Sequence, residues 1–169
     1  MKIYLLATNH SHQLVGIDNG KSQKLIKCLQ NLCKQNGDIN LIAEELNEEA
    51  ILLWKATDSA CRIAAKSMDL NHIFCEADAS ERKFYKIESQ EEVRRRLGFG
   101  KVLNKWQDKE MQDELKKYWP IRESIWLSKI CNFNFDGCLF VFGKDHYESF
   151  CSLLKQKSIP YETISCDWV

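Results

Sequence analysis

The chain has 169 residues, in which 24 lysine and arginine side chains balance 24 aspartate and glutamate side chains. A chain of this length removes roughly two-thirds of its unfolded surface from water, so it can form a core without disulfides or metal. Because the net charge is zero, no overall field favours binding to nucleic acid or to a membrane surface. No run approaches the roughly 18 apolar residues of a membrane-spanning helix. We therefore expect one soluble domain over residues 1–169.

Eight cysteines are spread along the chain, at positions 28, 33, 61, 75, 131, 138, 151 and 166, without a CxxC pair. This spacing gives no support for thiolate-bound zinc or for an iron–sulfur cluster. The opening apolar run, residues 3–7, is too short for a signal peptide, so we expect reduced thiols and a cytoplasmic protein.

The first part of the chain alternates strand and helix signals. In chain order, they predict a strand at 2–7, a helix over 22–35, a strand at 40–43, one helix from about 47 to 69 and a strand at 72–75. Asn36-Gly37 supplies the stop of the first helix, and Asn47 is a good N-cap for the second. The strand-to-helix alternation is typical of βαβ units.

The second part begins with a charge-rich segment, residues 79–118, in which Gly98-Phe99-Gly100 separates helical sequence at 89–97 from helical sequence at 104–118. We interpret this segment as a helical insertion, or a lid that opens for ligand entry. Pro120 fits the first turn of the next helix, where its missing N–H costs nothing. A strand at 138–142, a helix bearing Phe150 and a strand at 161–164 complete the chain.

Five short strands separated by helical sequence predict an α/β domain with a mainly parallel central sheet flanked by helices. In such sheets, ligands bind where the strands end. The one basic cluster, Arg94-Arg95-Arg96, lies one turn after Glu91 and Glu92 and is typical of a solvated helix face. We therefore expect neither nucleic acid nor a membrane as a partner.

Polar side chains directly follow four of the predicted strands: His10 and His12, Glu44 and Glu45, Glu76 and Asp78, and Asp145 and His146. Because the carboxyl ends of parallel strands meet at one edge of the sheet, we expect these side chains to lie close together. Neutral imidazole and carboxylate oxygen are the usual ligands of a divalent transition metal where thiolate is absent. The sequence therefore predicts a metal site at this edge.

Six residues are the candidates for this site. His10, Glu44 and His146 are the expected metal ligands, and the ion would be manganese, zinc, cobalt or iron. Glu45, Arg122 and Asp145 are the expected catalytic residues.

Each candidate also has a structural interpretation. A histidine at a strand end often caps a helix or binds a carbonyl, and paired acids usually form a solvated strand end. His12 and His72 are typical of loop or surface positions. Arg122 is different, because the dipole at a helix start disfavours a cation there. An anionic substrate group or Glu44 would explain its presence.

Four short motifs carry a resemblance to a known superfamily. They are Ala7-Thr8-Asn9-His10, Ala43-Glu44-Glu45, the segment Arg122-Glu123-Ser124-Ile125-Trp126-Leu127 and Gly143-Lys144-Asp145-His146. Their types and order resemble the TraB/Tiki and ChaN/erythromycin-esterase superfamily, which carries two Gly-x-x-His motifs, a glutamate after an early strand and an arginine before the second motif. Its members include metal-dependent proteases, esterases and haem-binding proteins. The resemblance implies roles for His10, Glu44 or Glu45, Arg122 and His146, although Ala7 replaces the first glycine.

From these observations we expect a metal-dependent hydrolase that acts on an ester or amide bond of a small-molecule or peptide substrate, with hydroxide supplied at the metal. The second glutamate would accept or return a proton, and Arg122 would hold an anionic group of the substrate or orient the acidic ligand. Two alternatives stay open. One is a small-ligand or haem-binding protein that uses the same pocket, and the other is a cysteine hydrolase with Cys75 as nucleophile and His10 or His146 as base.

Overall fold

A computed structural model describes residues 1–17 and 20–164. Five strands form one all-parallel sheet in the order β5-β3-β6-β1-β7, which confirms the predicted α/β fold. These strands are β1 (Lys2–Thr8), β3 (Ile39–Glu44), β5 (Asn71–Phe74), β6 (Gly137–Gly143) and β7 (Tyr161–Ile164). All five predicted strands are thus present in the sheet. Two shorter strands, β2 (Leu14–Val15) and β4 (Asp58–Ser59), form a separate antiparallel pair.

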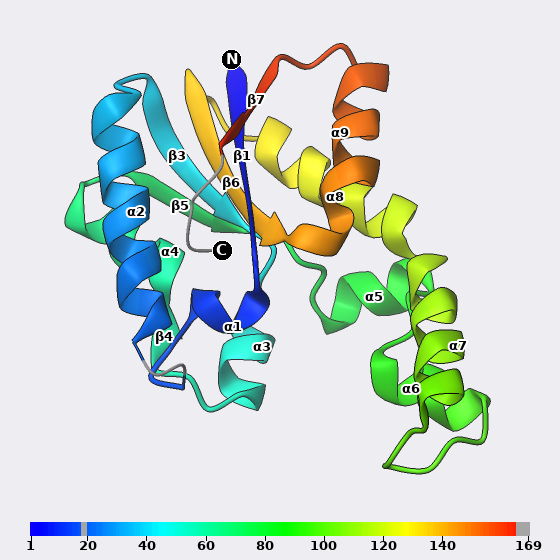
Figure 1. Ribbon diagram of the computed structural model, residues 1–169. Coiled ribbons are helices and arrows are strands. Elements are labelled where there is room, and N and C mark those ends of the chain that lie inside the picture. The colour runs from blue at the N-terminus through cyan, green and yellow to red at the C-terminus, as the bar shows by residue number, and fades with distance from the viewer. Residues whose placement is uncertain (18–19, 165–169) are drawn as a thin grey trace.

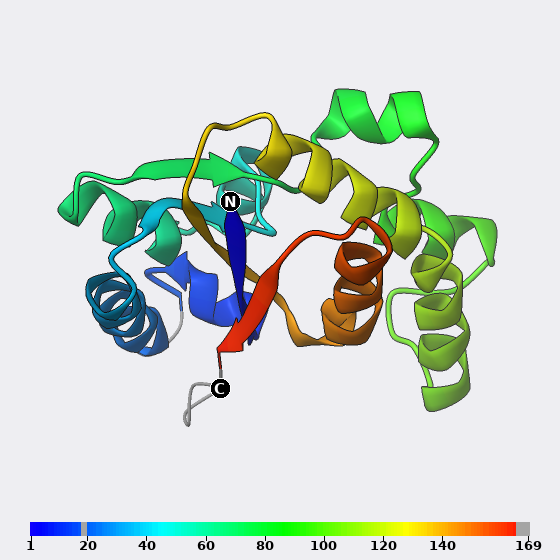
Figure 2. The ribbon, with the colours of Figure 1, turned by 90° about the horizontal axis from the view of Figure 1, so that it is seen from above.

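Helices cover both faces of the sheet. α2 (Lys21–Gln35) and α4 (Ala60–Ser67) pack on one face, and α8 (Trp119–Cys131) and α9 (Tyr147–Gln156) pack on the other (Figure 1). Seen from above, the two pairs of helices lie on opposite sides of the strands (Figure 2). No helix in the described ranges is long and apolar enough to cross a membrane.

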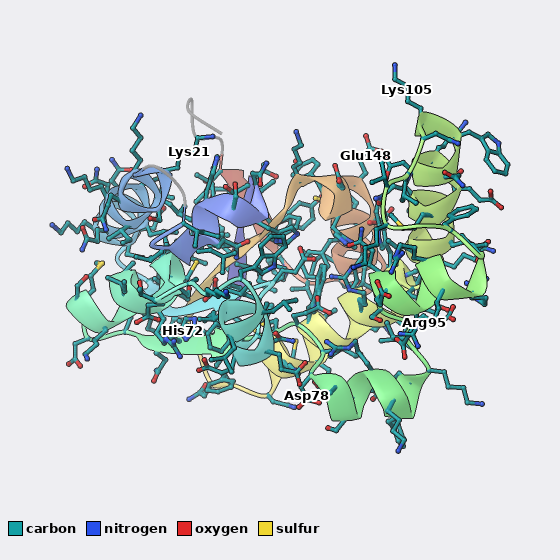
Figure 3. All side chains as sticks on the ribbon, turned by 90° about the horizontal axis from the view of Figure 1, so that it is seen from below. Lys21, His72, Asp78, Arg95, Lys105 and Glu148 are labelled. Carbon is teal, nitrogen blue, oxygen red and sulfur yellow. The ribbon has the colours of Figure 1, made fainter. Side chains whose placement is uncertain are left out.

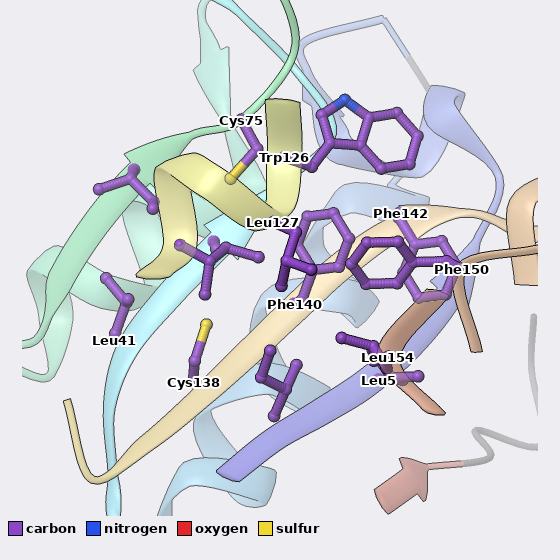
Figure 4. Close-up of a cluster of buried hydrophobic side chains, with 14 of the residues drawn as sticks. Leu5, Leu41, Cys75, Trp126, Leu127, Cys138, Phe140, Phe142, Phe150 and Leu154 are labelled. Atoms are coloured by element: carbon purple, nitrogen blue, oxygen red, sulfur yellow. The ribbon is translucent and has the colours of Figure 1, made fainter. Parts of the chain in front are cut away.

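The alternation of side chains along each strand separates two hydrophobic cores. In β1, Tyr4 and Leu6 face α2 and α4, whereas Ile3 and Leu5 face α8 and α9. On the second face, aromatic rings of β6, α8 and α9 pack together, with Phe140 at 5.1 Å from Phe142 between ring centroids (Figure 4). Both faces of the sheet are therefore buried, as expected for parallel strands.

The predicted helix over 47–69 is wrong, because the segment folds as two helices with a turn between them. α3 (Glu48–Leu53) ends before Lys55, whose backbone has φ of 55°. Ser59 then caps α4, and its side chain accepts hydrogen bonds from the backbone N–H groups of Cys61 and Arg62. Trp54, which the helical spacing of a single helix would place on the same buried face as Ile51, is 61% exposed. Serine is favoured at N-caps, so Ser59 inside the periodic pattern indicates that a second helix begins there.

The charge-rich segment forms three helices beyond the carboxyl ends of the strands, on the side of α8 (Figure 1). They are α5 (Ala79–Tyr85), α6 (Gln90–Arg96) and α7 (Lys105–Lys116). Each begins with a capping box, at Asp78, Ser89 and Asn104. Viewed with all side chains, Arg95 of α6 and Lys105 of α7 lie far from Lys21 of α2, at the opposite end of the molecule (Figure 3).

Replacement of Phe140 by alanine tests the aromatic core. The side chain is fully buried, so we expect the free energy of unfolding in urea to fall by about 3–5 kcal/mol. The matched control is Val102→Ala at a side chain that is 90% exposed, where the change should stay within about 0.5 kcal/mol. Similar losses for both variants would contradict the assignment of Phe140 to the core.

Candidate functional site

A cleft of about 570 Å³ opens at the carboxyl ends of the strands. The residues that follow β1, β3, β5 and β6 form one side of it, and they include His10, Glu45, Glu76 and His146. Arg122, from the first turn of α8, also lines the cleft. The sequence therefore correctly placed these side chains at one edge of the sheet, because the topology is parallel.

The opposite wall comes from the 79–118 segment. Ile87, Glu88 and Gln90 line the cleft from the region of α5 and α6, and Gln112 and Leu115 line it from α7. This placement agrees with a helical insertion beside the strand ends. Whether the segment opens and closes as a lid stays a prediction.

Arg122 joins two carboxylates that follow neighbouring strands. Its Nε and Nη2 donate to Glu76 at 3.1 and 2.7 Å, and Nη2 donates to Glu45 Oε1 at 2.7 Å. Burial works to raise the pKa of the Glu76 carboxyl, but the adjacent Arg122 guanidinium outweighs it, so this pKa lies below its ordinary value. Burial likewise opposes the charge of Arg122, yet Glu76 and Glu45 raise the pKa of the guanidinium. The site thus contains a permanent cation between two carboxylates.

Glu45 is the carboxylate that both histidines approach. Its side chain is 1% exposed, and its Oε1 lies 3.6 Å from His10 Nε2 and 3.7 Å from His146 Nε2. Its other oxygen, Oε2, accepts a hydrogen bond of 2.7 Å from the backbone N–H of Gly143. Glu45 is therefore fixed by the Gly143 N–H and by Arg122, and the Nε2 atoms of both imidazoles lie within 3.7 Å of its Oε1.

His146 is oriented by a second carboxylate, Glu123, which the sequence analysis did not single out. His146 Nδ1 lies 2.8 Å from Glu123 Oε1, and Ser149 Oγ donates to the same oxygen at 2.5 Å. Because an ionised carboxylate only accepts hydrogen bonds, Nδ1 carries the proton and Nε2 offers its lone pair toward the cleft. Arg122 Nη1 lies 3.4 Å from this Nε2.

A sequence signal for Glu123 was present. Residues 123, 126 and 130 follow helical spacing, so Glu123 shares a face of α8 with the buried Trp126 and Ile130. A glutamate on an apolar helix face needs a partner, because an unpaired buried charge is costly.

The ring of His146 lies close to two tryptophans, at 4.3 Å from Trp119 and 4.8 Å from Trp126 between centroids.

Glu44 lies apart from this group, although we expected it to bind metal together with His10 and His146. Its carboxylate contacts Ser59, His72 and Gln13 instead. The reason is the pleat of β3, which directs Glu44 to the same face as Ile42, toward α4, and Glu45 toward Arg122 on α8. His72, expected at the surface, is 12% exposed in this cluster.

The donor groups of the cleft bear on the metal site that the sequence predicts. The described residues contain no group of three or more His, Cys, Asp or Glu side chains that could hold a metal ion. Glu45 replaces Glu44 opposite the two histidines, but Arg122 Nη2 already contacts the same Oε1 at 2.7 Å. A second cation beside the guanidinium would be repelled. The arrangement therefore does not fit a resident divalent ion at this carboxylate, and the metal site expected from the sequence stays untested.

Asp145 and Cys75, the two remaining candidates, differ in their exposure to solvent. Asp145 lines the cleft at its exposed rim. Cys75, the alternative nucleophile, is fully buried in the same hydrophobic core as Trp126 and Cys138 (Figure 4). Burial raises the pKa of the Cys75 thiol well above its ordinary value. This environment favours a structural thiol over a nucleophile. Cys166 lies outside the described residues.

Gly143 provides a direct test of this geometry. A Cβ at position 143 would lie 2.6 Å from His10 Nε2 and 3.2 Å from Glu45 Oε2. We expect Gly143→Ala to leave the chain folded and to displace the His10 ring, because the exposed imidazole yields more easily than the backbone. Gly100→Ala, where a Cβ meets nothing within 4 Å, is the matched control. Crystal structures of both variants would check this, and an unmoved His10 in Gly143→Ala would contradict the site geometry.

Comparisons of the chain with protein-family models, with curated proteins and with solved structures gave no match. The resemblance to the TraB/Tiki and ChaN/erythromycin-esterase superfamily thus stays a prediction that rests on the four short motifs. The function is argued below from the side chains of the cleft.

Proposed function

We propose that the protein is a hydrolase that cleaves an ester or amide bond with water, and that His146 is its general base. The observation that carries the proposal is the pair formed by Glu123 and His146. Glu123 accepts from Nδ1 at 2.8 Å, and Nε2 on the cleft side of the ring accepts a long hydrogen bond of 3.4 Å from Arg122 Nη1, which a water molecule would replace in the reaction. A base whose far nitrogen is oriented by a buried carboxylate is a recurring arrangement in hydrolytic sites.

In the proposed reaction, His146 and Arg122 act directly on the water and the substrate, and both line the cleft. His146 Nε2 accepts a proton from a water molecule while the water oxygen attacks the carbonyl carbon of the substrate. The electrons of the C=O bond move onto its oxygen, and Arg122 stabilises this developing negative charge. When the tetrahedral intermediate collapses, the C–O or C–N bond breaks and His146 returns its proton to the leaving group. Water is the sole co-reactant.

Glu45 and His10 have supporting parts in this proposal. Glu45 is held by the Gly143 N–H and keeps Arg122 directed at the cleft. His10 has a side chain that is 51% exposed, and its Nε2 faces the same carboxylate from the solvent side. We propose that His10 accepts a hydrogen bond from the water or from the leaving group.

The cleft favours a substrate with an apolar portion beside the reacting carbonyl. Ile87, Leu115 and Trp119 line it, and Trp119 packs on His146. A small molecule or a peptide side chain would place its apolar part against this wall and its carbonyl near Arg122. A protein that binds such a ligand without cleaving it is the second candidate, because it would use the same wall.

Glutamine in place of Glu123 tests the proposed base. The amide keeps the size of the side chain but can donate to Nδ1 and so favour the wrong tautomer of His146. We expect kcat on a responsive substrate from a panel of small esters and amides to fall by about 100-fold or more, with KM little changed. His146→Gln should lose at least as much, while Glu148→Gln, at an exposed carboxylate of α9, should retain activity.

Circular dichroism would confirm that each of these variants is folded before kinetics are compared. Full activity in folded Glu123→Gln would reject His146 as the base. Binding of panel compounds to the wild-type protein without any turnover would instead favour the ligand-binding candidate.

Metal analysis tests whether hydrolysis needs an ion. We expect protein purified after growth with manganese, zinc, cobalt and iron to hold far less than one equivalent, because Arg122 already faces Glu45. The measurement is elemental analysis of wild type and of His146→Gln. One equivalent in wild type that is lost in His146→Gln would contradict this expectation and support the metal-dependent mechanism predicted from the sequence.

A further inference from the structure

Glu44 is fully buried, and its carboxylate contacts Gln13, Ser59 and His72 on the face of the sheet that packs against α4. Its Oε1 lies 2.8 Å from His72 Nε2, and Ser59 Oγ donates to the same carboxylate. Its Oε2 lies 3.1 Å from Gln13 Nε2. None of these three partners lines the cleft. The reaction proposed above makes no use of this cluster.

Gln13 connects this cluster with the cleft. It is the last residue of α1 (His10–Gln13), and its side-chain Oε1 lies 3.2 Å from His10 Nδ1. The same amide therefore contacts Glu44 at one end and His10 at the other. Gln13 is fully buried, so bulk water does not compete for either end.

The chemistry of the two ends fixes the direction of both hydrogen bonds. An ionised carboxylate only accepts, so the Gln13 atom that faces Glu44 must be the NH₂ group. The amide oxygen then faces His10, and because this oxygen only accepts, His10 Nδ1 must carry the proton. In the neutral ring the lone pair is consequently on Nε2, the nitrogen 3.6 Å from Glu45 Oε1.

We propose that Glu44 is a positioning residue, which acts through Gln13 to hold His10 in the tautomer whose Nε2 accepts hydrogen bonds in the cleft. The inference rests on the proposed function for its effect on the reaction, but not for its effect on the ring. Adjacent glutamates of one strand end thus act on one imidazole from opposite sides. Glu45 faces Nε2 directly, and Glu44 controls Nδ1 through an amide.

The exposure of His10 explains why such control matters. An imidazole whose side chain is 51% exposed would otherwise be free to rotate and to exchange its proton between both nitrogens through water. The absence of a side chain at Gly143 leaves room for Nε2 where a Cβ would come within 2.6 Å. Space beside Nε2 and a fixed acceptor, the Gln13 amide oxygen, beside Nδ1 define a single orientation of the ring.

The test is the tautomer of His10, read from long-range ¹H–¹⁵N spectra of labelled protein at a pH where the rings are neutral. The signals are assigned with His10→Gln. In wild type we expect the proton on Nδ1. In Glu44→Gln, the new amide can accept from or donate to Gln13, so the fraction with the proton on Nε2 should rise. Glu48→Gln, which removes an exposed carboxylate four residues away, should leave His10 unchanged.

A second variant is needed because Glu44→Gln also changes the contacts of Glu44 with Ser59 and His72. Gln13→Met keeps the length of the side chain and leaves the Glu44 contacts with those residues in place, but it removes the connecting amide. It should release the His10 tautomer in the same way. The tautomer of His146, which Glu123 holds, should stay the same in every one of these variants.

The outcomes separate this inference from the proposed function. A wild-type His10 with its proton on Nε2, or an unchanged tautomer in both variants, would overturn the role of Glu44. A tautomer change in a protein that hydrolyses nothing would support that role and reject the hydrolase. Where hydrolysis is found, the rate should fall in proportion to the lost Nδ1–H fraction, and an unaffected rate would reject positioning for the reaction.

Discussion

The interaction on which the site depends is the contact of Arg122 with Glu45 and Glu76. These carboxylates follow adjacent strands of the sheet, and the guanidinium that joins them comes from a helix on one of its faces. Removing one partner of a buried ion pair costs about 3–5 kcal/mol, because it leaves the remaining charge without compensation. Here, loss of the single cation would leave two carboxylates together. The same ion pairs fix α8, and through α8 they fix the position of Glu123 against His146.

The parallel sheet was predictable because its strands are short, apolar and separated by helical sequence. Four of the five strands are followed by polar residues, and this contrast between buried strand and polar end predicted the strand boundaries closely. The prediction of one helix over residues 47–69 was wrong because it relied on apolar periodicity alone. The apolar residues of this segment follow helical spacing through the break, and periodicity alone does not register the turn at Lys55 or the cap at Ser59. Local capping chemistry overrode the longer pattern there.

The parallel topology predicts that one cleft contains His10, Glu45, Arg122 and His146. It does not predict which other side chains contact these residues. The sequence shows two adjacent glutamates, and only the pleat of the folded strand decides which of them meets the histidines. The choice of Glu44 as a ligand therefore had no physical basis beyond the strand-end pattern. Gln13 and Glu123 act on ring nitrogens that point away from the cleft. Contacts of this kind depend on side-chain directions, which strand and helix periods leave undetermined.

The position of β6 in the sheet bears on how the chain acquires its structure during synthesis. β6 lies between β1 and β3, yet it leaves the ribosome long after both of them, and its residue Leu139 pairs with Tyr4 on one side and Ile42 on the other. Until then, the inner edges of β1 and β3 have no strand to pair with, and unpaired strand edges are prone to aggregation. The nascent chain therefore exposes both edges until β6 is synthesised, and the cleft, which needs His146 just beyond β6, is completed late.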